Sequence, residues 1–237
     1  MKYVVDDRGY SQIFDLTNKS NELRLRHRAD MMIAEISDPV NKKLMEIGAG
    51  TGDIAYWIAE KTPVDVLATD LCVPFMDSAR NKYVLPNLRY EVLDFNKAEQ
   101  FNNEKFDYII GNGILHHLYH NLDAAFVNMR DLLNDEGKIV FMEPNLFNPY
   151  VYFIFSYGWI RKLVKLEPDE MAFSPRFITK KLEKAGYKDI KVTFRDFVLP
   201  GLPQAIVKPV IALSDVLEKV PVIRCVSQSI FITAIKK

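Results

Sequence analysis

The sequence predicts an α/β fold with a doubly wound, mostly parallel sheet. Short apolar runs alternate with amphipathic segments, and glycines or polar residues follow several of the apolar runs. Alternation of strands and helices requires crossover connections, which cover both faces of a parallel sheet with helices. With 237 residues, of which 49% are hydrophobic, the chain is long enough to bury a large core.

Five strands are expected in the first part of the chain. They lie near residues 43, 64, 88, 106 and 137, in KLMEIG, VDVLATD, LRYEVLD, FDYIIGNG and GKIVFMEP. Helical patterns separate several of them, in GDIAYWIAEK, PFMDSARNKY and LDAAFVNMRDLL. The last of these helices is expected to end at the Asn-Asp-Glu-Gly turn before Lys138.

A helix is also expected before the first strand, in SNELRLRHRADMMIAEI, with Ser20 or Asn21 as its cap. Its apolar face contains Leu25, Ala29, Met32, Ile33 and Ile36. The arginines of LRLRHR are Arg24, Arg26 and Arg28. They are expected on a solvated face of this helix, although one of them is also suited to a cofactor carboxylate or an acidic substrate.

The chain after Pro144 is expected to add one helix and two strands. SPRFITKKLEKAGY has Pro175 near its first turn and Gly186 just past its end, an arrangement typical of helices. KDIKVTFRDF and the closing SIFITAIKK are predicted strands that form an antiparallel edge. We expect one domain over residues 1–237, with a cofactor-binding core at 40–145 and lid or cap insertions at 146–173 and 200–226.

Composition narrows the classes of partner. Lys plus Arg and Asp plus Glu are 31 each, so no overall positive field favours nucleic acid. Cys72 and Cys225 form no CxxC pair, which fits a reducing, cytoplasmic setting. The amino-terminal segment does not resemble a signal peptide. The most apolar stretch, residues 150–160, is shorter than the roughly 20 residues of a membrane-spanning helix.

Polar residues and glycines stand where the first four predicted strands end, which is where ligands bind in open parallel sheets. Gly48, Gly50 and Gly52 follow the first strand, and Asp70 ends the second. Glycines let a ligand lie directly against the main chain. Asp70 lies about 18 residues beyond the last glycine, where a carboxylate can accept hydrogen bonds from both hydroxyls of a ribose.

The third and fourth strands end at Asp94 and Asn112. Asp94 is expected to accept a hydrogen bond from an adenine amine, with Leu71 or Phe95 packed on the ring. Together with Asp70, these residues predict an adenosine site. A structural turn is the alternative for the glycines alone, but it does not explain the acidic residues at the following strand ends.

The form of the glycine motif distinguishes between cofactors. The spacing is Gly-x-Gly-x-Gly, whereas dinucleotide enzymes use Gly-x-Gly-x-x-Gly with a helix N-terminus aimed at a pyrophosphate. Glu46, just before the glycines, would repel a pyrophosphate. A cationic ligand is therefore favoured over NAD.

With these features the sequence resembles the class I, S-adenosylmethionine (SAM) dependent methyltransferases. The resemblance lies in LMEIGAGTGDIA, LATDLC, EVLDFN, FDYIIGNGILHHL and LLNDEGKIVFMEPN, and in the later AFSPRFITKKLEKAGYKDIKV and SIFITAIKK. It implies a Rossmann-like sheet with strand order 3-2-1-4-5-7-6 and strand 7 antiparallel. It also implies transfer of a methyl group from the sulfonium of SAM, with S-adenosylhomocysteine (SAH) as product.

The resemblance assigns roles to the residues at the strand ends. The loop of Gly48, Ala49, Gly50, Thr51 and Gly52 would hold the methionine part and the ribose, with Glu46 near the amino group of the cofactor. Asp70 would bind the ribose, and Leu71, Asp94 and Phe95 the adenine. Asn112 and Gly113 would lie beside the sulfonium.

The histidines His116, His117 and His120 follow the fourth strand. His116 and His117 are the candidate catalytic residues, as a base or an acceptor contact, and packing of the loop is the alternative. A base is needed only when the acceptor must lose a proton. The i, i+4 spacing of His116 and His120 also suits a metal pair, but the glutamate of His-Glu-x-x-His is absent and no metal is expected.

Aromatic residues gather in EPNLFNPYVYFIFSYGWI. This stretch predicts either a lid over an apolar acceptor pocket or a core helix. For the lid, the expected acceptor contacts are Glu143, Asn145 and Tyr150. The proline-rich stretch 200–226 is expected to cap the same site, and contact with a membrane interface is its alternative.

The sequence features are compared with three functions. The first is a SAM-dependent methyltransferase acting on a small or lipid-like acceptor, with at most peripheral membrane contact. The second is a SAM-binding partner module without transfer activity. The third is an NAD-dependent oxidoreductase, which the glycine spacing and Glu46 disfavour. A nucleic-acid substrate is not expected, because the fourth strand carries GNGILHHL and not an Asn-Pro-Pro-Tyr type motif.

Overall fold

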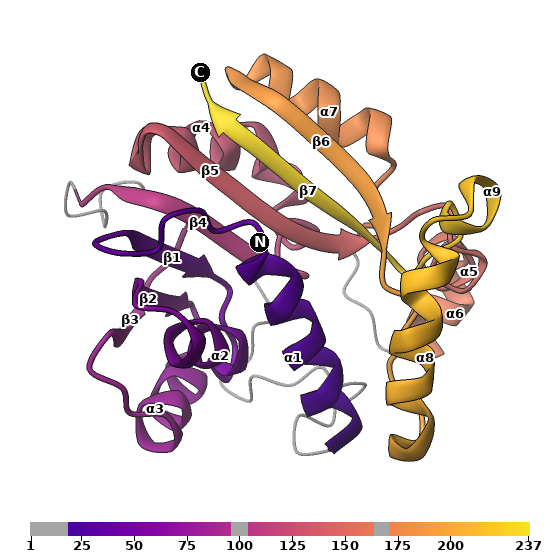
Figure 1. The fold of residues 1–237 in the computed structure, drawn as a ribbon. Helices are drawn as coiled ribbons and strands as arrows, with labels where there is room; N and C mark the ends of the chain where they lie inside the picture. Colours follow the sequence, from indigo (N-terminus) through magenta and orange to yellow (C-terminus); the bar gives the residue numbers. More distant parts are fainter. Residues whose placement is uncertain (1–18, 96–103, 164–170) are drawn as a thin grey trace.

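A computed structural model describes residues 19–95, 104–163 and 171–237. Its centre is a seven-stranded sheet with the order β3-β2-β1-β4-β5-β7-β6 (Figure 1). The strands are β1 (Lys43–Ile47), β2 (Asp65–Asp70), β3 (Leu88–Val92), β4 (Phe106–Asn112), β5 (Leu133–Pro144), β6 (Tyr187–Arg195) and β7 (Ser229–Lys236). β7 pairs antiparallel with both β5 and β6, and the other pairs are parallel. The predicted fold and strand order are confirmed.

The central strands are buried on both faces. In β1 every residue after Lys43 is buried, and β2 is buried from Val66 to Thr69. Strands covered on both faces need continuous apolar runs, which KLMEI and DVLAT supply. β6, at the edge of the sheet, instead alternates half-buried and exposed residues over most of its length.

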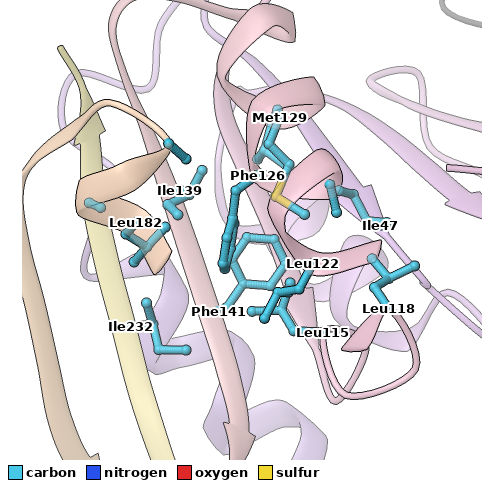
Figure 2. Close-up of a cluster of buried hydrophobic side chains, with 14 of the residues drawn as sticks. Ile47, Leu115, Leu118, Leu122, Phe126, Met129, Ile139, Phe141, Leu182 and Ile232 are labelled. Atoms are coloured by element: carbon cyan, nitrogen blue, oxygen red, sulfur yellow. The ribbon is translucent and has the colours of Figure 1, made fainter. Parts of the chain in front are cut away.

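Helices cover both faces. Ala29 and Met32 of α1 (Lys19–Ile33) and Ile58 of α2 (Asp53–Lys61) pack with β1 and β2 on one side. On the other side, α4 (Leu122–Leu132) and α7 (Pro175–Lys184) pack on β5 and β7. Figure 2 shows Phe126 and Phe141 within this second cluster. α3 (Val73–Lys82) contacts β2 and β3.

The structure differs from the predicted elements in two places before β6. Ser20 lies inside α1, which is described from Lys19, and is not its cap. The Asn-Asp-Glu-Gly turn is part of β5, because pairing with β4 already begins at Leu133. Glu136 has a φ of 60° and the register shifts there, so the strand passes through an irregularity where a turn was expected.

The segments expected to be insertions, residues 146–173 and 200–226, contain four helices among the described residues. They are α5 (Pro149–Ser156), α6 (Gly158–Leu163), α8 (Gln204–Leu217) and α9 (Pro221–Arg224), and they gather at the end of the sheet toward which β5 points (Figure 1). α8 is helical despite Pro209 in its interior. Val151 is the one buried residue of α5, so the core-helix alternative is wrong. In the described part of the chain, no helix has the length and apolar character to cross a membrane.

Candidate active site

The glycine loop joins β1 to α2 and opens on one side. Gly48, Gly50 and Gly52 have φ values of +65°, +54° and +75°, which side chains rarely adopt. A Cβ at Gly50 would meet nothing within 4 Å, so this position faces open space. A Cβ at Gly48 would lie 2.5 Å from Cδ1 of Ile114, which shows how closely this loop packs on the loop after β4.

Asp70 ties the glycine loop to the end of β2. Its Oδ2 accepts a hydrogen bond from the amide of Gly50 at 2.8 Å, and its Oδ1 accepts one from the amide of Cys72 at 2.8 Å. Burial raises the pKa of Asp70, and the backbone donors counteract this. Because the residue is only partly buried, its carboxylate stays at the rim of the open space beside Gly50.

Glu46 is a buried acid without a full set of partners. It is 2% exposed, and its Oε2 has no hydrogen-bond partner. Burial raises the pKa of Glu46 to about 8, and the negative charges of Asp53 and Asp70 act in the same direction. A cationic group placed nearby would supply the missing partner of Oε2. It would also favour the ionised carboxylate and so lower the pKa of Glu46. This orphaned oxygen and the open side of Gly50 fit a ligand with an ammonium group, as SAM has.

The residues predicted to contact the adenine differ in how exposed they are. Leu71 is 42% exposed and lies directly after β2, so its side chain is open to a ring. Phe95 is 5% exposed and belongs to the hydrophobic core together with Leu93. The expectation that Phe95 packs on the adenine stays a proposal, and Leu71 is the more accessible of the two. Asp94, which directly precedes Phe95, is half-buried.

A buried carboxylate organises the loop after β4. Glu143, near the end of β5, is 1% exposed. Its Oε1 accepts hydrogen bonds from the amides of Ile114 at 2.8 Å and Leu115 at 2.7 Å. Its Oε2 lies 2.8 Å from Nδ1 of His116. Glu143 therefore holds His116, and its predicted direct contact with the acceptor does not match this arrangement.

The pairing with Glu143 sets the chemistry of His116. A carboxylate that accepts from Nδ1–H selects the tautomer whose lone pair is on Nε2, which is the form that accepts a proton. His116 is 8% exposed and lies edge-on to Phe155 of α5, with ring centroids 6.5 Å apart. The ring of His117 is tilted against that of His116, with centroids 4.2 Å apart, but His117 is exposed. The geometry favours His116 over His117 as the base.

His116 and His120 do not have the α-helical arrangement on which the metal-pair alternative was based. His116 and His120 lie in a turn and in the 3-10 helix η2 (Tyr119–Asn121), so their i, i+4 spacing does not place them on one α-helix face. No cluster of three His, Cys, Asp or Glu residues able to hold a metal occurs within 19–95, 104–163 and 171–237.

The other predicted acceptor contacts have different positions. Asn145 is fully buried; its Nδ2 donates to the carbonyl oxygens of Cys225 and Ser227, at 2.9 and 2.8 Å. Its Oδ1 accepts from the amide of Phe147 at 3.0 Å. The side-chain amide thus joins the expected lid segment to the segment before β7, and the predicted acceptor contact of Asn145 stays a prediction that this arrangement does not favour. Tyr150, which is 44% exposed on α5, is still accessible.

The structure adds a polar cluster that the sequence did not predict. Arg24 and Arg28 are buried and contact the start of β7 and the loop after β6. Of the three arginines expected on a solvated helix face, only Arg26 is exposed. The sequence spacing could have predicted their burial. Arg28 lies four residues before Met32 and Arg24 four before Arg28, so both lie on the buried face of α1.

At the end of β4, the cluster meets the predicted sulfonium site. Oδ1 of Asn112 accepts a hydrogen bond from Nη1 of Arg28 at 2.7 Å. Gly113 has a φ of +66°, and its amide donates to the carbonyl of Met142 at 2.8 Å. The end of β4 is thereby fixed between α1 and β5.

Comparisons with known proteins agree with this geometry. Residues 45–139 match a family model described as a methyltransferase domain. A highly reducing polyketide synthase from a Fusarium species is 27% identical over 173 residues, which cover 67% of this chain and 7% of the synthase. The chain thus spans a small fraction of that curated relative.

Solved structures share the fold. A SAM-dependent methyltransferase from Archaeoglobus fulgidus has a TM-score of 0.65 and 15% identity, with 91% of this chain and 94% of that chain covered. The CurJ carbon methyltransferase has a TM-score of 0.57 and 20% identity, with 90% and 53% covered. The comparisons lead to one conclusion: residues 45–139 match a methyltransferase domain, and the chain shares its fold with solved SAM-dependent methyltransferases.

Proposed function

We propose that the protein transfers the methyl group of SAM to an acidic carbon of a small, partly apolar acceptor. The observation that carries this proposal is the buried pair of His116 and Glu143 at the ends of β4 and β5. Methyl transfer from a sulfonium needs mainly in-line positioning, which can supply roughly 7–11 kcal/mol. A carbon next to a carbonyl must in addition lose a proton, and a positioned base contributes about 10²–10⁴-fold.

Each group in the site has a role in this reaction. The bound cofactor supplies an electrophilic methyl group on sulfur. Glu46 and Asp70 hold its ammonium and ribose, and Asn112 stands at the reacting end. Nε2 of His116 takes the proton from the acceptor carbon, whose electron pair then forms the new C–C bond as the S–CH₃ bond breaks. Glu143 balances the positive charge that His116 gains.

The lid supports an apolar acceptor. Tyr150, Tyr152 and Phe153 of α5 are each about half exposed, as is Tyr157 after it, and Trp159 of α6 is 69% exposed. Such a cluster of exposed aromatic residues beside a site is typical of ligand-binding grooves. The names of the synthase and of the carbon methyltransferase found in the comparisons also favour a carbon acceptor and a polyketide-like molecule. A reducing, cytoplasmic setting stays an expectation from the sequence.

The proposal is tested with labelled SAM and acceptors of matched size: 2,4-pentanedione for carbon, a phenol for oxygen and an alkylamine for nitrogen. Mass spectrometry identifies the methylated atom. Carbon methylation that depends on His116 supports the proposal. Methylation of only the phenol or the amine would overturn it, and tight SAM binding without transfer to any acceptor would favour the non-catalytic binding module.

A further inference from the structure

Arg28 is a buried arginine whose hydrogen bonds are all made inside the protein. Its Nε donates to Oδ2 of Asp196 at 2.8 Å, and its Nη1 donates to Asn112. Its Nη2 donates to Oγ of Ser229 at 2.9 Å and to Oε1 of Gln228 at 2.5 Å. Asp196, which is fully buried, is therefore the counter-ion of Arg28.

Arg24, one helical turn earlier, is buried to a similar degree but pairs with no carboxylate within residues 19–95, 104–163 and 171–237. It is 6% exposed. Its Nε donates to the carbonyl oxygen of Val198 at 3.0 Å, and its Nη2 donates to Oε1 of Gln228 at 3.1 Å. Among the described residues, no hydrogen bond to its Nη1 is found. Both of its partners are neutral.

Among the residues that the structure describes, the cluster therefore holds one positive charge in excess. Two guanidinium groups face a single carboxylate, Asp196. The adjacent acid, Glu218, pairs with Arg195 at 2.6 Å. Burial lowers the pKa of Arg24 to about 9, with repulsion from Arg28 in the same direction and attraction by Asp196 against it. A buried charge whose hydrogen-bond partners are neutral is unfavourable for folding, so the fold keeps the charge of Arg24 at a cost.

The position of Arg24 indicates what would neutralise it. Arg28 contacts Asn112, where the methyl donor is expected to end. Arg24 lies about 6 Å further along α1, close enough to Tyr150 of the lid for the two to interact electrostatically. Its other neighbour, Val198, belongs to the loop that leads to α8, and α8 lies against α1 (Figure 1). The free side of Arg24 thus belongs to the acceptor end of the site.

We propose that Arg24 binds an anionic group of the acceptor, a carboxylate or a phosphate, a few bonds from the atom that is methylated. This inference rests on the proposed function for the identity of the ligand as an acceptor. It narrows the acceptor class to molecules that join an acid group to an apolar part. The acid meets Arg24, and the apolar part lies along the aromatic lid.

Binding is measured first, because it does not require methyl transfer. The SAH-loaded protein is titrated by calorimetry with 4,6-dioxoheptanoate, which has a carboxylate near an acidic carbon, and with its methyl ester, which has none. Inorganic phosphate is the second anionic probe and separates phosphate from carboxylate recognition. A charge-assisted hydrogen bond predicts that the acid binds about tenfold to a hundredfold more tightly than the ester.

Variants locate the effect. Arg24→Met should remove the preference for the acid over the ester, and Arg24→Lys should keep part of it. Arg26→Met is the matched control, because Arg26 is on the same helix, exposed and stacked on Trp57, and it should keep the full preference. Thermal denaturation checks folding, and Arg24→Met should not lower the melting temperature by much, because it removes an uncompensated buried charge.

The outcomes separate the inference from the proposed function. Tighter binding of the acid that depends on Arg24, without methylation of any diketone, would support the anion site and refute carbon transfer. Equal binding of acid and ester would overturn the anion site. So would a loss of affinity for SAH in Arg24→Met as large as that for the acid, since Arg24 would then bind the carboxylate of the cofactor.

Discussion

At the scale of single residues, the ionisation of Glu46 is expected to depend on whether a cationic ligand is bound. The side chain is sealed from water, and one of its oxygens has no partner. Its pKa of about 8 keeps the acid largely neutral at pH 7 when no ligand is present. An ammonium group would favour the ionised form, so that binding should release a proton.

This gives the first prediction. Between pH 6 and 8, the affinity for SAM should rise by up to about tenfold per pH unit, because Glu46 must ionise to pair with the ammonium, and it should level off above pH 8. Glu46→Gln should bind more weakly and with little pH dependence in this range. Calorimetry in buffers with different ionisation enthalpies measures the released proton directly. No proton release by the wild type would contradict this role.

Glu46 should also influence stability without ligand. A carboxyl group whose pKa is raised on folding stabilises the protein at low pH, and this contribution is lost as pH rises from the unfolded value near 4.3 through about 8. The Gln variant has no such loss. Its melting temperature should therefore exceed that of the wild type at pH 8 more than at pH 5.

The second prediction concerns His116 and its carboxylate partner. If His116 is the base, His116→Ala should lower kcat for a carbon acceptor by about 10²–10⁴-fold and leave SAM affinity nearly unchanged. Glu143→Gln should shift the pH dependence of kcat, because the amide no longer balances the charge of the imidazolium. The neighbouring His117→Ala is the control. An equal loss of kcat in both histidine variants would argue against this assignment.

At the scale of elements, the turn between β1 and α2 combines two tasks in adjacent glycines. Gly48 packs against Ile114 of the loop after β4, and Gly50 faces the open space beside Asp70. The first glycine therefore serves the packing of the fold, and the second leaves open space that a ligand can use.

The third prediction separates these tasks. Gly50→Ala should reduce SAM affinity by about tenfold or more, with a stability loss near 1–2 kcal/mol from the left-handed backbone alone. Gly48→Ala should lose more stability, because its Cβ would lie 2.5 Å from Ile114. Chemical denaturation and calorimetry measure both quantities. The double variant with Ile114→Val, which lacks Cδ1, should recover part of the stability, and no recovery would contradict the packing argument.

The element scale also shows where local patterns mislead. Four prolines between residues 200 and 221 suggest an irregular segment, yet α8 runs from Gln204 to Leu217 with Pro209 inside it. Oγ of Ser214 in α8 accepts from the amide of Phe197 at 3.2 Å, and α8 contacts α1. Tertiary contacts such as these outweigh the roughly 3 kcal/mol that an interior proline costs a helix.

At the scale of the whole molecule, β7 inserts between β5 and β6 and brings its first residues beside α1. Its antiparallel pairing places Gln228 and Ser229 beside α1 and Asp196. The amide of Gln228 donates to the carbonyl of Asp196 at 2.7 Å. The arginine cluster therefore depends on the placement of β7 in the sheet.

The fourth prediction follows from binding to the folded state alone. SAH at a hundred times its dissociation constant should stabilise the protein by about 2.7 kcal/mol. For a chain of this length, that corresponds to a rise in melting temperature of about 5–10 °C. NAD at the same concentration is the control and should give no rise. A shift with NAD and none with SAH would contradict the cofactor assignment.

The sequence by itself determined the alternation of strands and helices, the adenosine-type strand ends and the class of cofactor. These features are local: glycines at left-handed positions, acids at strand ends and the periodicity of apolar residues act within a few positions of the chain. The resemblance to a known family then supplied the strand order, which periodicity alone does not give.

Only the tertiary structure decided which polar residues meet. Glu143 and His116 come from the ends of neighbouring strands, and Arg28 and Asp196 are 168 residues apart in the chain. Asn145 shows the converse, because an amide that looked available is used by Cys225 and Ser227. Such contacts depend on sheet register and on the burial of charge, which short-range patterns do not encode.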